Sequence, residues 1–284
     1  MNPVAAMRAE YQRAERLLWI GVGVKAVIYL TTLATVTWDN RTADALFLVL
    51  ACVGQVFLFV SRVSMGGYLV VAERLRRLAM QQDGTGREPT SFELADLPER
   101  VWNVAGNSVP HPYYSSKLSK GSKRLIDITA ECAFFSGKIA HAAWMVSLVV
   151  SVAASGVLLL SLVLVAVLGA SQSRLELVAK CVLLGITFWM TEDLIDVALR
   201  YRSLADRCES ILQECFRLLD QQSPSVEEAY VVLHEYDAAV AGAPPLPNRF
   251  YRRRNEGLTR IWQETRLHHA NEVNAFNCGR TVNR

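Results

Sequence analysis

Two clusters of cationic and aromatic side chains are the residues of this chain best suited to hold a charged ligand. The first runs from His111 to Arg124 without an acid and contains Tyr113, Tyr114, Lys117, Lys120, Lys123 and Arg124. The second is the run Arg249, Phe250, Tyr251, Arg252, Arg253 and Arg254. Cations beside aromatic rings on a flexible Ser/Gly backbone suit a nucleotide or phosphate ligand. Contact with anionic lipid headgroups explains the same cations equally well, so both interpretations remain open.

Polar side chains inside long apolar stretches form a second group with possible chemistry. Lys25 and Gln55 occur at similar depth in two such stretches, and Glu192 and Asp196 occur one helical turn apart near the end of another. Lys25 either faces a water-filled path or pairs with Glu192 or Asp196, or else it extends its ammonium to the membrane surface. In an oligomer, Glu192 and Asp196 would repeat as an acidic ring that favours cations. Alternatively, they pair with nearby arginines at a helix end.

Small residues recur every fourth position in the third apolar stretch, at Ala143, Ser147, Ser151 and Ser155. Such a stripe allows two helices to pack closely. The same hydroxyl-bearing stripe could also line a narrow pore, and the spacing alone does not separate the two.

No catalytic motif accompanies these residues. The sequence contains no HExxH, GxSxG, Walker or GxGxxG pattern, and its six cysteines include no CxxC pair. His268 and His269 are adjacent, so on a helix they would point in different directions and make a poor metal pair. We therefore expect no enzyme activity, no metal and no cofactor.

Four apolar blocks must position these residues. A helix needs roughly 20 apolar residues to cross the hydrocarbon core of a bilayer, and each block is long enough. The blocks run from 17 to 38, from 45 to about 71, from 142 to 169 and from 175 to 199. We predict an all-α integral membrane protein with four transmembrane helices in two pairs. The predicted segments are 1–16 (N-terminal), 17–71 (first pair), 72–141 (cytoplasmic helical insert), 142–199 (second pair) and 200–284 (cytoplasmic stalk and tail).

The distribution of Lys and Arg predicts the orientation. The short connections at 39–44 and 170–174 hold only Arg41 and Arg174, whereas the central loop and the tail are rich in both residue types. Cytoplasmic loops carry the excess of positive charge. Both chain termini and the central loop are therefore predicted to face the cytoplasm.

Helix signals also occur outside the four blocks. The second block is expected to continue as a helix through 72–82, and Thr90 with Glu93 predicts a capping box that opens a short helix over 92–104. A helix from about Gly121 is expected to enter the third block, Ser225 with Glu228 to open a helix through Val240, and 249–269 to form a basic helix.

Past the fourth block, apolar residues follow heptad spacing. They are Leu194, Ala198, Tyr201, Ala205, Cys208, Leu212, Cys215 and Leu219, with Leu204, Ile211 and Leu218 widening the apolar face. The pattern fits either an intramolecular helical hairpin or an oligomeric stalk.

The layout resembles the SMODS-associated transmembrane effectors of bacteria, including the four-span and SLATT types. The resemblance rests on the two-plus-two arrangement of spans and on short motifs. These are 113–116 (YYSS), 129–135 (TAECAFF), Tyr236, 243–247 (APPLP) and Tyr251.

The resemblance implies a pore-forming effector of anti-phage defence in the bacterial inner membrane. A nucleotide or oligonucleotide signal, made by a partner nucleotidyltransferase, would act on an oligomeric channel, and ion flow would depolarise the membrane and kill the cell. A ligand favours whichever state it binds better, so it could open or close the pore. An ion channel or small transporter without a defence role, and a membrane-anchored scaffold, are the alternatives.

Overall fold

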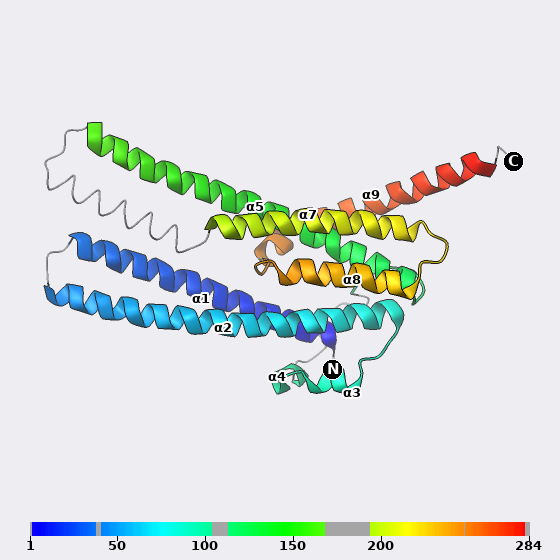
Figure 1. Cartoon of the computed structure of the whole chain (residues 1–284), viewed down its shortest axis with the longest axis horizontal. Coiled ribbons are helices and arrows are strands. Elements are labelled where there is room, and N and C mark those ends of the chain that lie inside the picture. The colour runs from blue at the N-terminus through cyan, green and yellow to red at the C-terminus, as the bar shows by residue number, and fades with distance from the viewer. Residues whose placement is uncertain (1, 38–40, 104–112, 168–193, 247, 282–284) are drawn as a thin grey trace. The chain divides into compact units, whose positions relative to one another are not determined.

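A computed structural model describes residues 2–37, 41–103, 113–167, 194–246 and 248–281, and within these ranges the only regular secondary structure is helix (Figure 1). The helices are α1 (Pro3–Thr37), α2 (Arg41–Thr85), α3 (Ser91–Ala95), α4 (Glu99–Trp102), α5 (Ser122–Val167), α7 (Leu194–Leu219), α8 (Val226–Ala241) and α9 (Asn248–Thr281). The predicted all-α class is confirmed for the described part of the chain.

The chain divides into two compact units. One comprises Met1–Glu10, Val70–Ala143 and Arg200–Arg284, and we call it the polar unit. The other comprises Tyr11–Leu69 and Trp144–Leu199, and we call it the apolar unit. Helices α1, α2, α5 and α7 each contribute residues to both units.

Two described helices are long and apolar enough to cross a membrane. They are α2 over Val49–Thr85 and α5 over Ser122–Ala153, with 11% and 33% of the residues in their most apolar stretches buried by protein. The core helix of a water-soluble protein would be mostly buried, so this low burial is compatible with a membrane location. The first and fourth predicted spans stay predictions, because side chains at the end of α1 and residues 168–193 lie outside the described part.

Close backbone approach joins α1 and α2 in the apolar unit. A Cβ atom on Gly54 would lie 2.7 Å from Ile28 Cδ1 and 3.6 Å from Val24 Cγ1, so this contact requires glycine unless Ile28 moves. Small residues serve this purpose at helix contacts in membranes. The two helices therefore pack tightly here while their other faces stay open, as Val53 and Phe59 show with exposed fractions of 61% and 69%.

The polar unit has a dense core drawn from five helices. Leu75 and Met80 of α2, Leu125, Ile126 and Ile128 of α5, Leu204 and Leu218 of α7, Leu233 and Tyr236 of α8, and Trp262 of α9 are almost completely buried. Capping boxes at Thr90 with Glu93 and at Ser225 with Glu228 open α3 and α8, which confirms both predicted helix starts. The predicted entry of a helix from about Gly121 into the third block is also confirmed by α5.

Two predicted helices have different bounds. The single helix expected over 92–104 is wrong, because α3 ends at Ala95 and α4 begins at Glu99. Pro98 lies between them as the N-cap of α4, where its missing N–H makes it a poor continuation of α3. The basic helix expected to end near His269 continues to Thr281 as part of α9.

The heptad region of α7 packs inside the polar unit. Tyr201, Leu204, Cys208, Ile211, Cys215 and Leu218 are all buried, whereas Ala205, Leu212 and Leu219 are only partly covered. The residues expected merely to widen the apolar face therefore lie at its centre. This burial within one chain favours the intramolecular alternative over an exposed stalk for this face.

Candidate functional site

The cationic loop, which we define as Tyr113–Gly121, is attached to the ends of α2 and α5. The Gly121 amide donates a hydrogen bond to the Gly84 carbonyl at 2.8 Å. Arg124 in the first turn of α5 donates to both Asp83 carboxylate oxygens of α2, at 2.9 and 3.1 Å. The two helices consequently meet beside the loop, and their ends define its position.

Glycines make this meeting of helices possible. A Cβ on Gly84 would lie 2.9 Å from the Leu125 backbone, so a larger residue would separate the two helices. Gly86 has a φ of +78°, which glycine adopts without strain, and this residue turns the chain as α2 ends. A Cβ on Gly86 would also lie 2.9 Å from Lys120 Cδ, so the aliphatic stem of Lys120 rests on this turn.

Two of the residues predicted to bind ligand make contacts within the polar unit. Arg124 is occupied by Asp83 and by the Leu118 carbonyl, to which it donates at 2.7 Å. Tyr114 is buried, with its ring 4.8 Å from that of Tyr113 in an edge-on arrangement. Burial raises the pKa of Tyr114 well above its usual value, so its phenol stays neutral. Tyr114 is thus covered by protein, whereas the Arg124 side chain is 14% exposed.

Tyr113 is half-buried and occupies the edge of the loop. The Arg8 guanidinium from α1 lies over the Tyr113 ring, 4.9 Å from its centroid. This cation–π contact brings a third cationic segment, the N-terminal helix, to the loop.

Three predicted ligand-binding lysines remain available. Lys117 and Lys120 are exposed and Lys123 is partly exposed, and none forms an ion pair with any residue in the described ranges. They flank Gly121, which precedes the first turn of α5 and has no side chain to accept hydrogen bonds from that turn. Free ammonium groups beside a helix N-terminus give a locally positive surface that attracts phosphate.

Ser115 connects the cationic loop to the C-terminal helix. Its amide and hydroxyl donate to Glu131 of α5 at 3.0 and 2.8 Å, and Trp262 Nε1 donates to the Ser115 oxygen at 3.2 Å. The predicted motif 113–116 is thus fixed on both sides by residues distant in sequence. No local pattern in the sequence could have indicated this contact of Trp262, because Ser115 lies 147 residues earlier.

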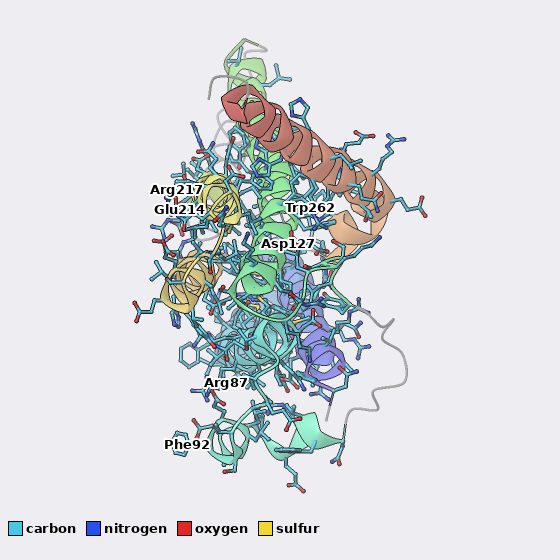
Figure 2. All side chains as sticks on the ribbon, turned by 90° about the vertical axis from the view of Figure 1, so that its right-hand side faces the viewer. Arg87, Phe92, Asp127, Glu214, Arg217 and Trp262 are labelled. Atoms are coloured by element: carbon cyan, nitrogen blue, oxygen red, sulfur yellow. The ribbon has the colours of Figure 1, made fainter. Side chains whose placement is uncertain are left out.

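Trp262 also anchors α9 to the polar unit (Figure 2). Its ring lies 5.2 Å from Phe134 and 6.3 Å from Phe216, and it is 1% exposed. One turn later, Arg266 donates to the buried Asp127 carboxylate at 2.8 Å. A stacked indole and a charge-assisted hydrogen bond therefore hold the same face of α9.

The second predicted cluster lies at the start of α9. Arg253 and Arg254 are exposed and form no ion pair within the described part of the chain. The side chains of Tyr251 and Arg252 lie outside the described residues. The structure connects the two clusters through the Ser115–Trp262 hydrogen bond, which lies about two helical turns after Arg254.

A buried ion cluster that the sequence reasoning missed lies in the core of the polar unit. Asp237 of α8 accepts from Arg76 at 2.9 Å and from Arg77 at 2.6 Å, both on α2. The Arg76 guanidinium also lies 4.6 Å from the Tyr236 ring centroid, and Tyr236 bonds Ser136 of α5 at 2.8 Å. Arg76 and Arg77 were assigned only to the topology signal, and nothing in their spacing pointed to a partner 160 residues away.

The predicted pore residues have varied surroundings. Lys25 is partly buried in α1, Gln55 is exposed on α2, and Ser147 and Ser151 are partly and fully covered on α5. Asp196 is exposed near the start of α7. The Ser151 hydroxyl has no hydrogen-bond partner within the described residues. Glu192 and the Ser155 side chain lie outside them, so the predicted pore lining stays a prediction.

Among the described residues, no group of three or more His, Cys, Asp or Glu side chains could hold a metal ion. The four described cysteines, Cys52, Cys132, Cys208 and Cys215, are free thiols.

No protein-family model matches the chain, and neither a curated protein nor a solved structure is similar to it.

Proposed function

We propose that this chain is an oligomeric ion channel of a bacterial inner membrane, controlled by a nucleotide that binds the cationic loop. The proposal includes four spans, cytoplasmic chain termini and a role as an effector that depolarises the membrane during phage infection. The ligand would lie against Lys117, Lys120 and Lys123, with Tyr113 offering a half-buried aromatic edge. Tyr114 would support the loop by packing against Tyr113, and Arg124 by its hydrogen bond to the Leu118 carbonyl.

The attachment of the loop to both long helices carries the proposal. The Gly121–Gly84 hydrogen bond and the Arg124–Asp83 ion pair hold the cationic loop at the ends of α2 and α5. These are the two described helices with enough length and apolarity to cross a membrane. A charge bound at the loop would act on the point where these helices meet, and continuous helices transmit displacement over long distances.

The sign of the response depends on which channel state holds the lysines closer together. Phosphate groups bind more tightly where several ammonium groups approach them. The ligand therefore shifts the population toward the channel state in which the lysines lie closer together. A channel that is open without nucleotide would close, and a closed one would open.

Ion flux through liposomes containing the purified full-length protein tests the proposal. Flux is measured with and without a panel of cyclic and linear oligonucleotides. We expect a nucleotide-dependent change, and we expect Lys117→Gln/Lys120→Gln/Lys123→Gln to weaken the apparent nucleotide affinity by about tenfold or more, because each charge-assisted contact contributes about 1.5–3 kcal/mol. Lys138→Gln, which removes an exposed lysine later on α5, is the matched control and should leave the affinity unchanged.

Three results would contradict parts of the proposal. Flux that ignores every nucleotide would leave an unregulated channel, and no flux from folded protein would favour the scaffold alternative. If the triple variant loses binding to vesicles with anionic lipids but keeps its nucleotide response, the lysines serve the membrane surface instead.

A further inference from the structure

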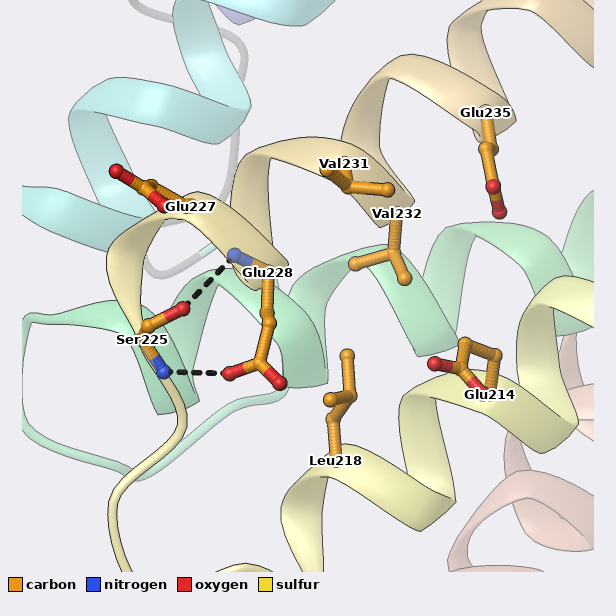
Figure 3. Close-up of a pocket in the computed structure, with 8 residues that line it drawn as sticks. All are labelled: Glu214, Leu218, Ser225, Glu227, Glu228, Val231, Val232 and Glu235. Carbon is orange, nitrogen blue, oxygen red and sulfur yellow. Dashed lines mark hydrogen bonds between the residues drawn. The ribbon is translucent and has the colours of Figure 1, made fainter.

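A groove on the polar unit lies between α7 and α8 (Figure 3). Its volume is about 340 Å³, and apolar side chains of Leu218, Val231 and Val232 lie along it. Four carboxylates line the same groove, Glu214 from α7 and Glu227, Glu228 and Glu235 from α8. An apolar floor with an acidic rim is suited to a helix that carries cations beside apolar residues.

Two carboxylates of the groove, Glu214 and Glu228, have a lowered pKa. Hydrogen bonds from Arg217 lower the pKa of Glu214, and the Ser225 amide and hydroxyl lower that of Glu228. Glu227 and Glu235 form no ion pair with any residue in the described ranges. The groove therefore offers at least two carboxylates without a cationic partner.

The outer face of α9 has the complementary composition. Arg253, Arg254 and Arg260 are exposed there, together with Ile261 and Leu267, which are 43% and 65% exposed. The opposite face is committed to the core through Leu258 and Trp262, so α9 presents this surface outward. Among the residues that the structure describes, Arg260 forms an ion pair only with Glu264 of the same helix, at 3.9 Å.

The two surfaces belong to one compact unit but do not neutralise each other within it. No ion pair among the described residues connects the groove carboxylates to Arg253, Arg254 or Arg260. We infer that the outer face of α9 from one copy docks into the α7–α8 groove of a neighbouring copy. The contact is head to tail, because a different surface is used on each partner, and repetition of such a contact closes a ring when the rotation allows it.

This interface rests on the oligomeric part of the proposed function and is independent of ion conduction. Docking leaves the packing of α7 inside the polar unit in place, because the contact is made by exposed side chains such as Glu227, Val231 and Glu235. Charge complementarity selects the partner and the register, and the apolar pairs add contact area.

Charge reversal on each side of the contact tests the inference. The groove variant is Glu227→Arg/Glu235→Arg, and the helix variant is Arg253→Glu/Arg260→Glu. Each alone places like charges at the contact and should raise the protomer concentration at half-assembly by about tenfold or more. Mixed one to one, the two variants restore opposite charges at both alternating contacts, so assembly should return toward the wild-type value. The mass distribution of the full chain in nanodiscs, without nucleotide, is the readout.

Controls keep the test decisive. Glu88→Arg/Glu209→Arg reverses two exposed carboxylates of the polar unit outside the groove and should assemble as wild type. Circular dichroism of each variant establishes that the helices are intact. Wild-type assembly by both single-sided variants, a mixture of folded variants that fails to reassemble, or a monomeric wild-type chain would each overturn the inference. None of these results depends on whether the protein conducts ions.

Discussion

The polar and apolar units treat apolar side chains in opposite ways. In the polar unit, Leu75, Ile126 and Trp262 are at most 1% exposed. In the apolar unit, Phe59 and Val152 are 69% and 65% exposed. Water-soluble proteins rarely leave large contiguous apolar surfaces uncovered, because each exposed Å² of apolar area costs about 25 cal/mol in water. The difference indicates that one chain contains a unit stabilised by its own core and a unit whose exposed apolar surface is compatible with a membrane location.

Buried charge distinguishes the units as well. The polar unit encloses Glu10, Arg76, Asp127 and Asp237, and each has a partner of opposite charge. Breaking such a pair leaves one ion desolvated without compensation, which destabilises a protein far more than losing a surface pair. The polar unit is therefore sensitive to single charge deletions, whereas the apolar unit is sensitive to charge insertions.

The largest expected effect comes from deleting Asp237. Asp237→Ala removes the charge-assisted hydrogen bonds to Arg76 and Arg77 and leaves the 9% exposed Arg76 side chain with Glu73 as its remaining acidic partner. Losing both bonds in the core should lower the free energy of unfolding by about 3–5 kcal/mol. Hydrogen exchange of α8 in the nanodisc-embedded chain measures the loss. Asp206→Ala is the matched control, because Asp206 is 72% exposed and lies 4.0 Å from Arg202. Its loss should stay below about 0.5 kcal/mol, and equal losses in both variants would contradict the buried-pair argument.

A second prediction inserts a charge in each unit at valines of similar exposure. Val53 of the apolar unit is 61% exposed and Val226 of the polar unit is 56% exposed. Val53→Asp should oppose membrane insertion by about 2.5–3.5 kcal/mol, because a carboxylate would enter the hydrocarbon region. Val226→Asp should change stability by less than about 0.5 kcal/mol, since the site faces water in the first turn of α8.

The membrane-bound fraction after alkaline extraction measures this difference. Loss of the bound fraction in Val53→Asp alone would sharpen the distinction between the units. A fully retained Val53→Asp variant would show that the exposed face of α2 does not meet lipid.

The smallest expected effect concerns the capping box of α8. Ser225→Ala removes the hydroxyl that accepts from the Glu228 amide at 3.1 Å, which should destabilise the polar unit by about 1 kcal/mol. Ser223→Ala is the control. Ser223 lies two residues before Ser225 at an exposed site, so its loss should be neutral. Denaturant unfolding followed by the amide exchange of α8 compares them, and an equal loss in both would argue against the cap.

The same box predicts a pH dependence. Hydrogen bonds from Ser225 lower the pKa of Glu228 below its ordinary value of 4.5. A carboxyl with a lowered folded pKa contributes stability above its unfolded pKa and loses it as pH falls through the folded value. The difference between wild type and Ser225→Ala should therefore be full at neutral pH and shrink below about pH 4.5.

Local signals in the sequence were sufficient for two capped helix starts. Thr90 with Glu93 and Ser225 with Glu228 open helices as predicted, because these hydrogen bonds join residues three positions apart and need no other part of the chain. Pro98 is also a local signal that favours a helix end, but the prediction of one helix over 92–104 did not take it into account. The length and composition of two apolar stretches similarly predicted α2 and α5.

The candidate site was only partly predictable for the same physical reason. The cations of the loop were visible as residues, but whether each one is free depends on neighbours brought together by folding. Lys117 and Lys120 stay exposed, whereas Arg124 forms an ion pair with Asp83, 41 residues earlier. A local pattern predicts which side chains share a helix face. It does not predict which other segment of the chain packs against that face.

The sequence by itself determined the helical class, the capped helix starts and the apolar stretches, because these depend on neighbouring residues and on composition. Only the tertiary structure decided that Asp237 forms a buried ion cluster with Arg76 and Arg77. It also decided that Trp262 donates a hydrogen bond to Ser115 of the cationic loop, and that α7 and α8 line an acidic groove. The first two arrangements need segments distant along the chain, and the groove needs two consecutive helices to fold against each other; packing in three dimensions selects which segments meet.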